Sequence, residues 1–180
     1  FPRLISETGL FTENSTPAVG VTAYKIAMQQ YADGAWSEHV IALPDNETVM
    51  LLKDGSMQYP AATVLAKTIF INEWQSRQRR PVETQVMFMQ DGQWQFYTYA
   101  WRADQSDADL VPATGSYLKI ETSDKYVPGG KRALNWRLHS RTECVTCHNG
   151  RSPVLAFRSD QLHANLTGNA SMQPTQLQAL

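Results

Sequence analysis

The sequence predicts a mainly β protein, built as an antiparallel β-sandwich. Short runs in which apolar and polar residues alternate recur along the chain, which is typical of strands with one buried face. Gly, Pro, Asp and Asn bound these runs, and helical periodicity is scarce. The 180 residues are enough for one domain with a buried core. We therefore expect a single β-rich domain over residues 1–180, which is either complete or one module of a larger protein.

Seven runs are expected to form strands. They lie at residues 21–29, 40–43, 48–53, 62–72, 83–90, 94–101 and 117–121. Asp91 and Gly92 separate the fifth run from the sixth, and this pair suits the two-residue loop of a β-hairpin. Residues 123–132 are polar and contain a Pro-Gly-Gly run, so they are expected to lead irregularly into the segment that follows.

Charge and hydropathy exclude two classes of partner. The formal net charge of -1, from 16 Lys and Arg against 17 Asp and Glu, provides no general attraction to nucleic acid or to anionic lipid. No run approaches the roughly 20 apolar residues that span a bilayer. We therefore expect no nucleic-acid partner and no transmembrane segment in this chain.

The chain contains one Cys-x-x-Cys-His motif, formed by Cys144, Cys147 and His148. This motif is typical of covalent haem attachment. Two thiols separated by two residues reach the two vinyl groups along one porphyrin edge, and the next residue places its imidazole on the iron. Both cysteines of the chain lie in the motif. We therefore expect one haem c, with His148 as the proximal iron ligand, on a short helical or loop segment at about residues 134–165 near the C-terminus.

Two other kinds of site use the same residues. A redox dithiol usually follows a strand and opens a helix of a βαβ unit, and no such unit is visible upstream of the motif. A zinc site needs four ligands, so the two cysteines would have to recruit two of the chain's histidines at irregular spacing. These histidines are His39, His139, His148 and His163.

The sixth iron ligand stays open in the sequence. The candidates are Met57, Met87, Met89, Met172 and His163. Met87 and Met89 share one face of an expected strand because strand side chains alternate. Core packing is the other interpretation of that pair.

Lys67 is an unusual residue because it shares a strand face with Leu65 and Ile69 in an otherwise apolar run. One interpretation is a lysine at a sheet edge, whose stem covers apolar surface. The other is a lysine that is desolvated against the haem, which would lower its pKa and leave a neutral amine able to act as base, nucleophile or ligand. We therefore include Lys67 among the candidate cofactor-binding residues.

Four segments in the same order resemble those of a known group. They are YPAATVLAK at 59–67, VMFM at 86–89, DGQWQF at 91–96 and the motif at 144–148. Together they resemble the β-sheet cytochromes with a lysine-linked haem and their relatives, the β-type cytochromes c-prime, over residues 59–149. The resemblance implies a β-sandwich with the haem motif near its C-terminus, and a strand lysine that can be cross-linked to the porphyrin. The matching residue here is Lys67.

A second resemblance rests on other segments. They are FPRLISETGLF at 1–11, DGA at 33–35, IALP at 41–44, ETQ at 83–85 and YTYAW at 97–101. These resemble exported bacterial c-type cytochrome proteins, in which the block is often one module of a larger haem protein. The sequence departs from that family at Ala61-Ala62, where a Gly is usual, and at His139, where the family tends to have Pro. The second departure argues against His139 as a shared ligand.

These observations predict a periplasmic or extracellular bacterial c-type cytochrome that passes single electrons between redox partner proteins. The alternative is a haem protein with an open sixth site that binds or acts on hydroxylamine or nitric oxide, as the lysine-linked group does. A third class is a structural or carbohydrate-binding sandwich in which haem is an addition and the aromatic side chains of the run 94–101 stack on sugars. Alternating strand aromatics, however, are more often core residues.

Overall fold

The computed structural model describes residues 1–12, 16–74, 79–150 and 153–162. These residues form a mainly β fold, which confirms the predicted fold class. In chain order the described elements are η1 (Ile5–Thr8), β1 (Val21–Tyr24), β2 (Trp36–Ala42), β3 (Met50–Leu51), β4 (Met57–Gln58), β5 (Val64–Asn72), β6 (Arg79–Gln90), β7 (Gln93–Trp101), β8 (Ala108–Leu110), β9 (Ser116–Ser123), η3 (Pro128–Gly130), β10 (Lys131–Leu138), α1 (Arg141–Cys147) and α2 (Ser159–Leu162).

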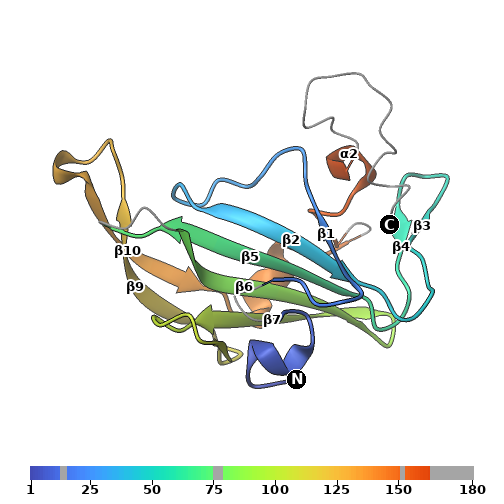
Figure 1. Ribbon diagram of the computed structural model, residues 1–180. Helices are drawn as coiled ribbons and strands as arrows, with labels where there is room; N and C mark the ends of the chain where they lie inside the picture. The colour runs from blue at the N-terminus through green and yellow to red at the C-terminus, as the bar shows by residue number, and fades with distance from the viewer. Residues whose placement is uncertain (13–15, 75–78, 151–152, 163–180) are drawn as a thin grey trace.

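A six-stranded antiparallel sheet in the order β1-β2-β5-β6-β7-β8 forms the centre of the fold (Figure 1). The hairpin between β6 and β7 turns at Asp91 and Gly92, as predicted from their sequence. Both residues have positive φ, at 51° and 74°, which is the conformation that a two-residue type I′ loop requires. The turn sets the register of β6 and β7, with Gln90 opposite Gln93.

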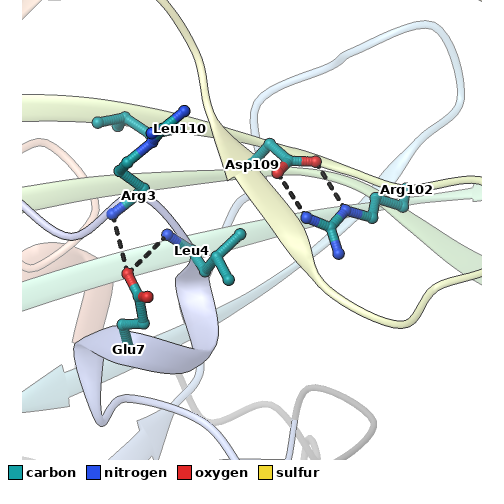
Figure 2. A pocket seen from close by; sticks show the side chains of 6 residues that line it. All are labelled: Arg3, Leu4, Glu7, Arg102, Asp109 and Leu110. Carbon is teal, nitrogen blue, oxygen red and sulfur yellow. Dashed lines mark hydrogen bonds and ion pairs between the residues drawn. The ribbon is translucent and has the colours of Figure 1, made fainter.

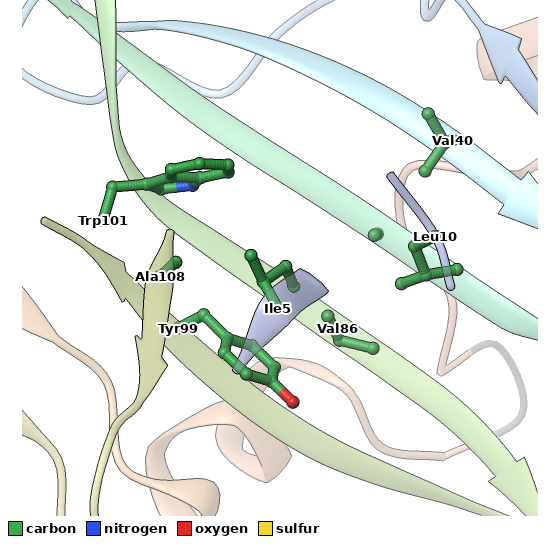
Figure 3. Close-up of a cluster of buried hydrophobic side chains, with 8 residues drawn as sticks. Ile5, Leu10, Val40, Val86, Tyr99, Trp101 and Ala108 are labelled. Carbon is green, nitrogen blue, oxygen red and sulfur yellow. The ribbon is translucent and has the colours of Figure 1, made fainter. Parts of the chain in front are cut away.

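One face of this sheet packs against the N-terminal segment (Figure 3). Ile5 of η1 and Leu10 lie on the sheet residues Val86 and Tyr99, and all four are buried. The Tyr99 hydroxyl donates to the carbonyl of Pro2 at 2.8 Å, so the aromatic residue also holds the start of the chain. The run 94–101 thus uses Tyr99 and its neighbour Trp101 as core residues.

The opposite face is covered in separate parts. The β9–β10 pair covers one end, where Ile69 and Val82 pack against Trp136 and Leu138. The segment around α2 covers the other end, where buried residues of three strands and of the C-terminal segment meet. These residues are Tyr24, Ile41, Leu65, Val154, Phe157 and Leu162. Figure 1 shows α1 on this same side of the sheet, between the two covering parts.

Several expected boundaries were wrong. Residues 25–29 were expected to continue β1, but the strand ends at Tyr24. Beyond it, the backbone N–H of Ala27 donates to Gln161, and the Gln29 side chain bonds both backbone groups of Ser37. These contacts take the place of a sheet partner.

The start of the expected haem segment also needs correction. Residues 134–138 belong to β10, which pairs with β9 along its whole length. Residues 131 and 132, expected in an irregular lead, belong to the same strand. The motif-bearing segment therefore begins at the N-cap of α1, Ser140.

Within the described part of the chain, no helix combines the length and the apolar character needed to cross a membrane.

Candidate functional site

Helix α1 carries both cysteines of the motif and is capped at each end. Ser140 accepts a hydrogen bond from the backbone N–H of Glu143, and Glu143 accepts one from that of Ser140, which forms a capping box. At the other end, the Asn149 amide donates to the carbonyls of Val145 and Thr146 at 2.9 and 2.7 Å. The caps satisfy the free backbone groups of a helix only two turns long.

The helix lies against β7. The ring of His148, which follows the helix, is 5.4 Å from that of Phe96 between centroids. The Thr98 hydroxyl donates to the carbonyl of His139 at 3.2 Å, and the Arg141 guanidinium lies 4.8 Å from the ring of Tyr97. The motif is thereby held close to one strand of the large sheet.

The imidazole of His148 has a defined orientation. Its Nδ1 lies 2.6 Å from the carbonyl oxygen of Pro153. A carbonyl oxygen only accepts, so Nδ1 carries the proton and donates. In the neutral ring the Nε2 lone pair is then available to a metal, and a backbone carbonyl bond of this kind is the usual partner of a metal-binding histidine.

The two thiols occupy the second half of α1, with Cys144 partly buried and Cys147 exposed. Burial raises the pKa of the Cys144 thiol, and the nearby carboxylates of Glu83 and Glu143 act in the same direction. A redox dithiol needs the opposite, a thiolate stabilised by a helix N-terminus or a cation. The surroundings of Cys144 therefore argue against the dithiol interpretation.

A row of polar side chains crosses the sheet face that carries α1. Directly paired residues of antiparallel strands lie on one face. Five strands contribute one residue each to the row, namely Tyr24, His39, Lys67, Gln85 and Thr98. Thr98 contacts the segment leading into α1, so the row extends from the motif-bearing segment to β1.

Lys67 stands in the middle of this polar row. Its side chain is partly buried between Leu65 and Ile69, which are both buried. Desolvation lowers the pKa of Lys67, while the attraction of Glu83 partly opposes this shift. Glu83 itself is fully buried and accepts hydrogen bonds from Trp136 at 2.8 Å and Gln85 at 2.9 Å. Burial nevertheless raises the pKa of Glu83.

His39 is the neighbour of Lys67 in the polar row and has an unsatisfied nitrogen. The residue is 4% exposed, and its Nε2 is buried without a hydrogen-bond partner among the described residues. Burial, and then the positive charge of Lys67, lower the pKa of His39 to about 4. The imidazole is therefore neutral at physiological pH. A buried nitrogen of this kind is explained by backbone strain, by a bound water or ion, or by a catalytic role.

The buried neutral state of His39 predicts a pH-dependent stability. Unfolded chains protonate this histidine below its ordinary pKa of 6.5, whereas the folded protein resists protonation down to about 4. Lowering the pH through this interval should therefore cost up to about 3 kcal/mol of unfolding free energy. Glu83 opposes this trend, because its raised pKa adds stability as the pH falls.

The contribution of His39 is measured as a difference between proteins. Urea unfolding at about pH 7 and about pH 4.5 should show a smaller pH effect in His39→Phe than in wild type. The exposed His139 provides the control, because its charge acts on Glu83 from the surface, and His139→Phe should therefore alter the pH effect less than His39→Phe does. Equal pH effects in wild type and His39→Phe would contradict the buried neutral state.

The candidate sixth ligands fall in different places. Met57 and Met87 pack at the edge of the cluster that contains Phe157, so both have packing roles. Met87 also lies opposite Phe96, on the face that carries α1, and Met89 shares that face two residues along the strand. Met172 and His163 lie outside the described residues.

Other features of the described residues bear on the alternative kinds of site. In residues 1–12, 16–74, 79–150 and 153–162, no group of three or more His, Cys, Asp or Glu side chains is placed to hold a metal ion. The zinc interpretation would need such a group. One pocket lies between η1 and β8 (Figure 2), and an ion pair between Arg102 and Asp109 and the hydrogen bonds of Glu7 occupy its polar groups. It is formed by the N-terminal segment, β8 and Arg102 of the loop that precedes β8, not by the motif-bearing segment.

Comparison with known proteins adds no relative. The chain matches no protein-family model, no curated protein and no solved structure. The site therefore has to be interpreted from its own geometry.

Several residues of this site have no signal in the sequence. Pro153 is the hydrogen-bond partner of His148, Phe96 lies against its ring, and Glu83 is a buried acid beside Lys67. For Glu83 and Gln85, alternation along their strand could have placed both side chains on the face of Lys67. That inference requires the register between the two strands.

Proposed function

We propose that this protein is a c-type cytochrome with one covalent haem c, attached through Cys144 and Cys147 and ligated by His148. It would pass single electrons between redox partner proteins. Covalent attachment of this kind takes place outside the bacterial cytoplasm, so the proposal also places the protein in the periplasm or outside the cell.

The single observation that carries the proposal is the hydrogen bond from His148 Nδ1 to the carbonyl of Pro153 at 2.6 Å. It leaves Nε2 as the ligating atom and orients the ring, which is the arrangement expected of a proximal iron ligand. Cys144 and Cys147 lie one turn apart on the preceding helix, and neither residue is fully buried.

The remaining residues also fit a haem. The face that carries α1 offers the apolar ring of Phe96 and the partly buried Met87, together with the buried Nε2 of His39, which has no hydrogen-bond partner among the described residues. An apolar wall and a small number of polar groups are typical of cofactor sites. When bound, haem would supply an iron that alternates between two oxidation states and so carries one electron.

An optical spectrum tests the proposal. The chain is produced in a bacterial host that attaches haem to exported Cys-x-x-Cys-His proteins, and intact mass is measured after denaturation. We expect the mass of one haem and, on reduction, the sharp α and β bands of a low-spin c-type haem. A protein that carries no covalent haem under these conditions would overturn the proposal.

The polar row favours a second candidate function. Lys67, Gln85 and the buried Glu83 lie on the face that carries α1, so a haem there would have hydrogen-bonding groups beside it. The resemblance to lysine-linked cytochromes adds hydroxylamine or nitric oxide as the ligand or substrate. High-spin bands that shift with carbon monoxide or nitric oxide would favour this open-site function over electron transfer.

Lys67→Ala should alter the haem spectrum, its reduction potential or its affinity for added ligands. The reason is that Lys67 lies partly buried on the face that carries α1, where burial lowers its pKa. Lys67→Arg should not restore the wild-type properties, because a guanidinium stays charged and is larger. Intact mass gives a separate measurement, since a lysine bond to the porphyrin would remove hydrogens beyond the two thioether additions.

Lys119→Ala serves as the matched control, because Lys119 is an exposed lysine on β9. It should behave as wild type in all these measurements. If Lys67→Ala also behaves as wild type, Lys67 is only a packing residue of the sheet, and simple electron transfer remains the proposed function.

A further inference from the structure

We propose that Arg137 is a positioning residue, which holds the haem-bearing helix α1 at a fixed place against the sheet through its bond to Glu143. This inference rests on the proposed function and deepens it, because it names what orients the haem attachment site. It assigns a role to a residue outside the motif and outside the polar row.

Arg137 connects three parts of the chain. Its guanidinium makes two bonds to the carboxylate of Glu143, at 3.2 Å from Nε and 2.6 Å from Nη2. It also donates to the carbonyls of Thr114 and Ser116, both at 3.2 Å, and lies 4.8 Å from the ring of Tyr117. The planar fork of an arginine supports this geometry, whereas a lysine presents a single nitrogen.

Glu143 transmits this position to the helix. The same carboxylate accepts the backbone N–H of Ser140 at 2.7 Å, and Ser140 in turn accepts the N–H of Glu143. The next residue along the helix is Cys144, and the backbone N–H of His148 donates to the carbonyl of Cys144 at 2.9 Å. The bonds of Arg137 therefore determine where the first thiol and the proximal imidazole lie.

The residue beside Arg137 contacts the other side of the site. Trp136 points to the opposite face of β10, where its Nε1 donates to the buried Glu83 at 2.8 Å. Two adjacent residues of one strand thus contact the sheet face and the motif-bearing helix. These two contacts link the buried Glu83 to the helix that carries Cys144.

Gly115 provides an independent observation of how closely these parts fit. A Cβ atom on Gly115 would lie 2.6 Å from Arg137 Nη2, 2.6 Å from the carbonyl oxygen of Leu138 and 2.8 Å from the nitrogen of Ser140. The loop before β9 thus lies directly on the segment that leads into α1. Any side chain at this position should displace both the arginine and the helix N-cap.

The experiment compares haem-loaded variants by electron paramagnetic resonance of the oxidised protein and by reduction potential, with thermal unfolding recorded beside them. Arg137→Gln and Gly115→Ala should shift the resonance signal or split it into several haem environments, and should shift the potential. Arg137→Lys should not restore the wild-type signal, because one ammonium cannot make both bonds to Glu143.

Two matched controls separate positioning from stability. Arg102→Gln removes another paired arginine, whose bonds to Asp109 are 2.8 and 2.7 Å long. Gly129→Ala strains a glycine of similar φ, at 78° against 77° for Gly115, where a Cβ would have no neighbour within 4 Å. Both controls can lower the melting temperature but should keep the wild-type resonance signal and potential.

The outcomes are distinct. A wild-type protein without covalent haem would overturn the proposed function and this inference together. If the wild type carries haem, this inference alone is overturned when Arg137→Gln and Gly115→Ala both keep the wild-type resonance signal and reduction potential. This holds even if their melting temperatures are lower. If Arg137→Gln fails to fold, Gly115→Ala and Arg137→Lys decide the question by the same measurements.

Discussion

Replacing both Cys144 and Cys147 with Ala should leave no haem on the protein after denaturation. The proposed attachment consists of two thioether bonds, and these are the only two cysteines in the chain. Coordination by His148 alone does not survive denaturation, because an iron–imidazole bond depends on the folded geometry around it. The measurement is haem staining on a denaturing gel together with intact mass, and the expected change is complete loss of the haem signal.

The two residues between the cysteines supply the control. Val145 and Thr146 are exposed on the same helix and carry no thiol. A Val145→Ala, Thr146→Ala double variant should therefore keep the full haem signal. A haem band that persisted in the double cysteine variant would contradict attachment through these two cysteines alone.

His148→Ala should keep covalent haem through the cysteines but change its spin state. The substitution removes the imidazole that the Pro153 carbonyl orients, so the iron would lose its proximal nitrogen ligand. The optical spectrum and the electron paramagnetic resonance signal of the oxidised protein report this change in spin state directly. We expect loss of the low-spin spectrum, with a further decrease in stability from the lost contact with Phe96.

The matched control for this prediction is His139→Ala. His139 is an exposed histidine nine residues earlier in the sequence, and its described contact with Thr98 is made by its backbone carbonyl. Its variant should keep the wild-type spectrum. If His148→Ala and His139→Ala both kept it, His148 would not be the proximal ligand.

Local patterns were enough to predict the fold class and the central hairpin. Alternation of apolar and polar residues reports which face of a strand is buried, so β5, β6 and β7 were all expected near their observed positions. The Asp91-Gly92 turn was confirmed because a two-residue loop has strict backbone requirements that few residue pairs meet. The Cys-x-x-Cys-His motif is likewise local, since all three of its side chains lie on two turns of chain.

Strand β10 differs from the irregular lead that was expected before the motif, although its sequence alternates as a strand does. Its residues Leu134, Trp136 and Leu138 alternate with polar residues, but the Pro-Gly-Gly run before them drew the expectation toward irregular structure. That run in fact forms the short η3 turn, which closes the hairpin between β9 and β10. The alternation that is typical of a strand was therefore present in the sequence, but the Pro-Gly-Gly run before it favoured the prediction of irregular structure.

The composition of the candidate site depends on contacts between distant residues. Pairing of β2, β5 and β6 places His39 and Gln85 beside Lys67, because a shift of one residue in register would move each side chain to the other face. The bond from His148 to Pro153 depends on how the chain turns after α1. Sequence patterns therefore identified the Cys-x-x-Cys-His motif and the strand of Lys67, which are set by neighbouring residues. Strand register and packing of α1 determined which residues surround them, because these depend on the free energy of the whole sheet.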